Sequence, residues 1–109
     1  MRAAVLTQPG EPPAVAEHPD PVPTAGQTLV RVTAAPVVPL DLLCASGTSY
    51  FGRPAVPGVQ GVGVVLSSAV LAPGTRVWFA TWAGMSPSDG SLGELCAVPD
   101  ADVVPLAGD

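Results

Sequence analysis

Lysine is absent from this chain, and its positively charged side chains are four arginines and a single histidine among 109 residues. The formal net charge is -5 at pH 7. A protein that binds along a nucleic acid neutralises phosphates with a stripe of basic side chains, and the sequence has no such stripe. We therefore expect no nucleic-acid partner.

Long apolar runs are also missing, because 14 prolines and 12 glycines interrupt every apolar segment. A membrane-spanning helix needs roughly 18 to 20 consecutive apolar residues. The apolar run at the N-terminus stops at Gln8 and Pro9, which is too short for the core of a signal peptide. The sequence predicts no membrane partner and a cytoplasmic location.

Cysteine is scarce, and the two cysteines are Cys44 and Cys96, far apart in sequence and without a CxxC pair or a neighbouring histidine. This spacing resembles neither a zinc cage nor a disulfide scaffold, so we interpret both as small apolar core residues. Hydrophobic residues make up 48% of the chain and charged residues 12%. That composition, at this length, predicts one folded domain.

What the chain does have is frequent turns between short segments rich in β-branched and aromatic residues, which is typical of a mainly β domain. The segment 27–38 begins with alternating polar and apolar residues, as in a strand with one wet face. Short strands at this spacing predict a small, partly open barrel. The predicted strands cover residues 2–7, 14–19, 27–38, 61–66, 75–82 and 93–98, whereas residues 99–102 read as a turn.

One short helix is predicted over residues 39–45. Pro39 suits the first helical position, Asp41 lies in the first turn where the helix dipole favours a carboxylate, and Gly47 can end the helix. The helix is two turns long at most.

The segment PGVQGVGVV, residues 57–65, raises the question of a nucleotide-binding loop. A dinucleotide fingerprint has the order GxGxxG after a strand and before a helix, whereas here the order is GxxGxG and a β-branched run follows. We therefore expect Gly58, Gly61 and Gly63 to allow tight turns or close backbone approach.

The order of five segments resembles the N-terminal, GroES-like domain of medium-chain dehydrogenases/reductases. They read MRAAVL, PLDLLCASG, PGVQGVGVV, PGTRV and GSLGELCAVPDADVVPLAGD, and together they span nearly the whole chain. The similarity favours the zinc-independent quinone oxidoreductase branch. It implies a mainly β, GroES-like partly open β-barrel with one or two short helices.

The resemblance also bears on zinc. The positions that match the catalytic zinc ligands of zinc-dependent relatives hold Val38 and Val59, and valine cannot ligate zinc. His18 lies far in sequence from both, and we interpret it as a solvated surface residue. The resemblance therefore implies no bound zinc. Quinone oxidoreductases usually carry Asn where Val38 stands, so this chain departs from them at that point.

The implied activity is hydride transfer from NADPH to a quinone, enone or similar carbonyl compound. The Rossmann domain that would bind NADPH is absent from these residues, so the chain is expected to be a fragment or a natural truncation, and a homodimer is left open. We assign substrate-side roles to Tyr50, Val38 and Gln60. We assign structural roles in loops and turns to Asp41, Gly58, Gly61, Gly63 and Arg76.

Two other classes of function stay open. One is a stand-alone, non-catalytic GroES-like binding domain, and the other is a co-chaperonin, which would need a mobile partner-binding loop and a ring interface. An in-frame cofactor fingerprint downstream would favour the enzyme, and a stop codon would favour the binding domain.

Overall fold

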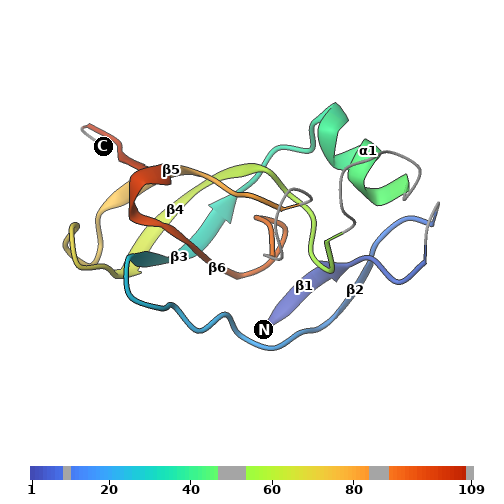
Figure 1. The fold of residues 1–109 in the computed structure, drawn as a ribbon, viewed down its shortest axis with the longest axis horizontal. Coiled ribbons are helices and arrows are strands. Elements are labelled where there is room, and N and C mark those ends of the chain that lie inside the picture. The colour runs from blue at the N-terminus through green and yellow to red at the C-terminus, as the bar shows by residue number, and fades with distance from the viewer. Residues whose placement is uncertain (9–10, 47–53, 84–88, 108–109) are drawn as a thin grey trace.

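The structure is a computed structural model that describes residues 1–8, 11–46, 54–83 and 89–107 (Figure 1). Seven strands, one α-helix and one short 3-10 helix follow one another along these residues. The elements are β1 (Arg2–Val5), β2 (Ala14–Glu17), β3 (Gln27–Ala34), α1 (Pro39–Ser46), β4 (Gln60–Ser67), β5 (Arg76–Ala80), β6 (Leu95–Pro99), η1 (Asp100–Asp102) and β7 (Val103–Pro105).

The main sheet has five strands in the order β6-β3-β4-β5-β7, and all neighbours are antiparallel. A second sheet consists of β1 and β2 alone. The segment before β6 joins the two sheets, because Ala4 N donates to Leu92 O at 2.8 Å and Val32 N donates to Glu94 O at 2.9 Å. The predicted mainly β fold with one short helix is confirmed.

The core lies against one face of the five-stranded sheet. Strands β3, β4 and β5 alternate buried and more exposed residues, as period-two side chains do. Seven of the buried apolar side chains form a cluster, to which β7 contributes its first residue. Its members are Val30, Val65, Val77, Phe79, Cys96, Val98 and Val103. The interpretation of Cys96 as a core residue fits this burial, whereas the side chain of Cys44 lies outside the described residues.

The turn predicted at residues 99–102 lies where the chain forms a short 3-10 helix, whereas the strand that follows it was not predicted. Asp100–Asp102 form η1, and β7 then pairs with β5 through Phe79 and Val103. A strand of three residues is too short to show a hydrophobic period, and its partner β5 is distant in sequence. Tertiary pairing alone makes it a strand.

Helix α1 begins at Pro39 as predicted, and it ends at Ser46. The expected stop at Gly47 lies outside the described residues. Within the described residues, no helix combines the length and the apolar character needed to cross a membrane.

Candidate functional site

Val38 and Asp41 hydrogen-bond to each other at the start of α1. Val38 precedes the helix, and its backbone N donates to Asp41 Oδ2 at 2.9 Å, while Asp41 N donates to Val38 O at 2.9 Å. A carboxylate three residues into a helix that accepts from the preceding backbone N–H is one half of a capping box. Asp41 thus fixes the direction in which Val38 leads into the helix.

The carboxylate of Asp41 is only partly satisfied. The residue is 4% exposed, and its Oδ1 has no hydrogen-bond partner among the described residues. Its position in the first turn places the negative charge beside the positive end of the helix dipole, which offsets part of the desolvation. Val37 next to Val38 is 65% exposed, so the start of α1 combines a buried acid with an exposed apolar side chain.

The start of β4 is held by backbone contacts. Val56 O, Pro57 O and Gly58 O accept from the backbone N–H groups of Gly90, Leu92 and Ser91, at 2.7, 3.0 and 3.1 Å. Gly58 O also accepts from Thr81 Oγ1 at 2.5 Å. Residues 56–58 and 90–92 therefore run side by side, although they lie far apart in sequence.

Glycine is required at Gly58 on two grounds. Its φ is +116°, a conformation that side chains rarely adopt. A Cβ there would also lie 2.7 Å from the backbone N of Ser91 and would collide with Ser91 Oγ. The sequence around Gly58 does not indicate its contacts with Ser91 and Thr81, because both residues are distant in sequence and meet Gly58 only in the folded chain.

Gly61 and Gly63 lie inside β4 and face the core. A Cβ on Gly61 would be 2.8 Å from Phe79 Cζ, and one on Gly63 would collide with the carbonyl oxygen of Arg31. Residues 60–67 form a strand, so this segment has no helix N-terminus at which a pyrophosphate could bind.

Gln60 is the first residue of β4 and is half-buried. Its Oε1 accepts from Trp78 Nε1 at 3.2 Å. The acceptor oxygen of Gln60 thus has a partner, and within the described residues no hydrogen bond from its amide N–H groups is found.

The start of α1 and the start of β4 belong to the same end of the sheet, because Ala34 at the end of β3 pairs with Val62 near the start of β4. Helix α1 projects from this end (Figure 1). Tyr50 lies outside the described residues, so its distance from Val38 and Gln60 is not defined. Arg76 is the exposed first residue of β5 rather than part of the turn before it.

The interpretation of His18 as a solvated residue was wrong. Its side chain is 19% exposed, and Nε2 lies 2.8 Å from Asp89 Oδ2. The pairing ties the end of β2 to the segment before β6, and Asp89 is too far along the sequence to be recognised as its partner in advance.

Cys96 is buried, and its Sγ donates to Asp89 O at 3.9 Å. Burial, followed by the negative charge of Asp89, raises the pKa of its thiol to about 12. The thiolate that reacts as a nucleophile or metal ligand is therefore scarce at neutral pH.

Metal-binding side chains do not gather within the described part of the chain, where no group of three or more His, Cys, Asp or Glu residues is found. Val59, which follows Gly58, carries a hydrocarbon side chain, as does Val38. The residues at these two positions do not fit a catalytic zinc ion.

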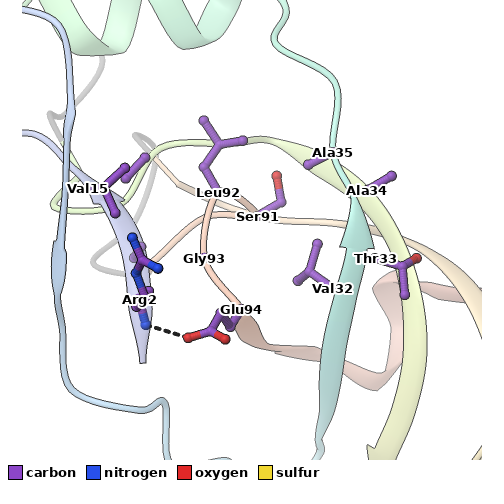
Figure 2. A pocket seen from close by; sticks show the side chains of 12 residues that line it. Arg2, Val15, Val32, Thr33, Ala34, Ala35, Ser91, Leu92, Gly93 and Glu94 are labelled. Carbon is purple, nitrogen blue, oxygen red and sulfur yellow. Dashed lines mark hydrogen bonds between the residues drawn. The ribbon is translucent and has the colours of Figure 1, made fainter.

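A separate open pocket of about 490 Å³ lies between the β1–β2 ribbon, the end of β3 and residues 91–94 (Figure 2). Apolar side chains such as Val32 and Leu92 line it, with Arg2 and Glu94 as its charged residues. Glu94 Oε1 accepts from the backbone N of Arg2 at 2.6 Å. Neither Val38 nor Gln60 lines this pocket, although it reaches the same end of the sheet through Ala34, Ser91 and Leu92.

Known proteins resemble this chain in sequence and in fold. The chain is 35% identical over 88 residues to a zinc-type alcohol dehydrogenase-like protein of Schizosaccharomyces pombe, covering 79% of this chain and 27% of that protein. A solved alcohol dehydrogenase superfamily protein of Novosphingobium aromaticivorans matches with a TM-score of 0.85 and 25% identity, over 96% of this chain and 34% of the other.

The quinone oxidoreductase of Thermus thermophilus, also solved in complex with NADPH, matches with a TM-score of 0.77 and 30% identity, over 97% of this chain and 32% of the other. The chain thus spans about a third or less of the length of each of these relatives.

The model of the alcohol dehydrogenase GroES-like domain matches residues 24–108, which is more than half of the chain. The strand order, the single helix and the solved relatives all agree with that match. This chain belongs to the alcohol dehydrogenase GroES-like domain family.

Proposed function

We propose that this chain is the substrate-side domain of an NADPH-dependent, zinc-independent cytoplasmic oxidoreductase that reduces a quinone or an enone. A Rossmann domain outside these residues would bind the cofactor. The observation that carries the proposal is the match to the Thermus thermophilus quinone oxidoreductase over 97% of this chain at 30% identity. The chain's coverage of only 32% of that protein supports a fragment of a longer enzyme.

The proposal favours the zinc-independent branch although one relative carries a zinc-type name. Zinc needs nitrogen, sulfur or oxygen ligands, and Val38 and Val59 offer none. A catalytic zinc ion also keeps three protein ligands, so two hydrocarbon positions are a large deficit. The proposed reaction therefore involves no zinc ion.

NADPH supplies the hydride when it is bound, and the described residues supply the opposite wall of the cleft. Asp41 fixes the direction in which Val38 leads into α1, and Val37 and Val38 give the start of the helix an apolar surface. Gln60, held by Trp78, would donate an amide N–H to a substrate oxygen. Tyr50 remains our candidate for a second polar contact, and it lies outside the described residues.

The test compares two proteins. The first is the 109-residue chain, and the second is the same chain joined to the part of the Thermus thermophilus enzyme that follows its matching domain. Calorimetric titration measures NADPH binding, and absorbance measures quinone-dependent oxidation of NADPH. We expect tight binding and turnover from the chimera only, because the part of the chain that the structure describes contains no glycine turn followed by a helix.

A folded chimera that binds NADPH without reducing quinones would favour the alternative, a non-catalytic binding domain. Micromolar binding of NADPH by the 109-residue chain would contradict the assignment of Gly58, Gly61 and Gly63 to close packing.

Val38 provides a second, sharper test in the same chimera. Val38→Asn restores the polar residue that quinone oxidoreductases usually carry, and one hydrogen bond worth about 1 kcal/mol would raise kcat/KM about fivefold. Val37→Asn is the matched control, because it adds the same amide one residue earlier, at a position that is 65% exposed. Equal effects of the two substitutions would remove Val38 from the substrate side.

A further inference from the structure

The five-stranded sheet has a second apolar face, which we call the outer face. Its side chains alternate with the buried residues of β4, β5 and β7 and point away from the core. Antiparallel sheets commonly keep a polar face toward solvent, and an apolar pattern on both faces is typical of sheets covered on both sides. The outer face comprises Gln60, Val62, Val64, Leu66, Arg76, Trp78, Ala80 and Val104.

The strand register concentrates the apolar side chains. Val62 pairs with Trp78, and Trp78 pairs with Val104, so three large apolar residues lie side by side across three strands. Val104 is 49% exposed, and Leu66 on the same face is 41% exposed. Trp82, which follows β5, is 48% exposed. Val62 and Trp78 are half-buried, so the row is a continuous, partly exposed apolar surface, and apolar surface that stays in contact with solvent in this way indicates an interaction site.

Two arginines lie on one side of the apolar row, Arg76 on the outer face itself and Arg31 on the adjoining strand β3. Arg31 pairs with Val64, which pairs with Arg76, so the two arginines are two strand spacings apart, roughly 10 Å. None of the ion pairs among the described residues involves either of them. In a two-fold contact between two copies, the same patch faces itself, so four arginines would crowd one interface. Like charges that meet there cost several kcal/mol, which argues against a second copy as the cover.

The relatives indicate what else could cover the face. This chain accounts for 32% of the Thermus thermophilus enzyme and 34% of the Novosphingobium aromaticivorans protein. A face whose centre is apolar suits a permanent contact better than a transient one. The rest of one long chain would make such a contact.

We propose that the outer face is covered by the part of a longer oxidoreductase chain that lies outside these 109 residues, with Trp78 and Val104 at the centre of the contact. The inference rests on the proposed function, because it takes the chain to be one domain of a longer enzyme. It adds a second surface through which the domain is held in that enzyme, and this surface adjoins the substrate side at Gln60, which accepts from Trp78 Nε1.

The test measures how fast a cysteine on the outer face reacts with a maleimide. Val104→Cys places the thiol at the centre, and Val22→Cys is the control, because Val22 is 83% exposed and lies outside the strands. Both variants carry Cys44→Ser, and Cys96 stays unreactive because burial raises its pKa to about 12. The Thermus thermophilus part of the chimera has its own cysteines replaced.

We expect the thiol at position 104 to react at least about tenfold more slowly in the chimera than in the 109-residue chain, because covered surface reacts only when it opens. The thiol at position 22 should react equally fast in both. Light scattering should find the 109-residue chain monomeric.

Equal reaction rates at position 104 would overturn the inference, and quinone reduction by that chimera would leave the proposed function standing. Protection at position 104 in a chimera without quinone reduction would support the inference while the proposed function fails. A dimer of the 109-residue chain that already protects position 104 would show that a second copy is the cover. A chimera without a folded circular-dichroism spectrum counts against the inference.

Discussion

The start of β4 and the start of α1 lie at the same end of the sheet, but they are built in opposite ways. Residues 56–58 are fixed by backbone hydrogen bonds to residues 90–92, and Gly58 has no room for a side chain. The start of α1 depends on one carboxylate, that of Asp41, and leaves Val37 exposed. Substitutions near Gly58 are therefore restricted by backbone packing. Substitutions of the exposed side chains at the start of α1 are not.

This difference bears on where specificity can reside. A substitution at Gly58 disturbs backbone packing, so it changes the fold before it changes the chemistry. A substitution at Val38 changes the surface of α1 while the contact between Asp41 and the backbone remains. In the function proposed above, substitutions at the start of α1 would therefore change substrate choice with little loss of stability.

The largest expected effect tests the crowding at Gly58. Gly58→Ala should lower the free energy of unfolding by about 3 kcal/mol or more, because the new Cβ meets Ser91 and the backbone conformation is strained. Gly26→Ala is the control, since Gly26 has φ +84° but nothing within 4 Å of a Cβ, and it should cost about 1 kcal/mol. Urea denaturation measures both, and equal losses would show that Ser91 does not confine Gly58.

Thr81→Val sharpens the same side of the comparison. The buried Thr81 hydroxyl donates to Gly58 O and accepts from Ala83 N at 3.3 Å, so its removal leaves a buried N–H unpaired and should cost about 2 kcal/mol. Thr33→Val removes a hydroxyl that donates to Val62 O at 3.2 Å from an exposed residue, and it should cost about 0.5 kcal/mol or less. Thermal unfolding of the two variants measures both losses of stability. A larger loss for Thr33→Val than for Thr81→Val would contradict the role given to the Thr81 hydroxyl.

Asp41→Ala tests the start of α1. Loss of the carboxylate that accepts from Val38 N should cost about 1 kcal/mol, because the penalty at Oδ1 is relieved at the same time. Leu42→Ala, one residue later and 66% exposed, should change stability by less than about 0.5 kcal/mol. A loss above about 3 kcal/mol for Asp41→Ala would indicate that Oδ1 has a strong partner that the described residues do not supply.

The sequence was sufficient for the elements whose signals are local. The β-branched run after Gly63, and Pro39 with Asp41, predicted a strand and a helix close to their observed bounds, whereas the strand predicted over residues 27–38 was too long, because β3 ends at Ala34. It was insufficient wherever the cause lay across the fold. The strand β7, the pairing of His18 with Asp89, and the hydrogen bond from Trp78 to Gln60 all depend on residues that only folding brings together.

The smallest expected effect extends the comparison to an exposed ion pair. The ammonium group of Met1 donates to Asp20 Oδ1 at 2.7 Å and to His18 O at 2.9 Å. The hydrogen bond to Asp20, followed by the charges of Asp20 and Glu17, raises the pKa of this group above 8.0 against the opposing effect of burial. A raised pKa in the folded state means that the charged form stabilises the fold.

The raised pKa of the Met1 ammonium determines how its contribution to stability changes with pH. The stabilisation is fully present below the unfolded α-amino pKa, which is about 8, and it is lost as the pH rises through the higher folded value. For the chain that begins at Met1, acetylation of the amino group should therefore lower Tm most below about pH 8, and the difference should shrink above it. Asp20→Asn should lower Tm in the free-amine chain and change little in the acetylated chain, because the acetylated chain has no ammonium for Asp20 to hold. An equal loss of Tm in both chains would show that Asp20 affects stability through another contact and that its ion pair with the Met1 ammonium does not stabilise the fold.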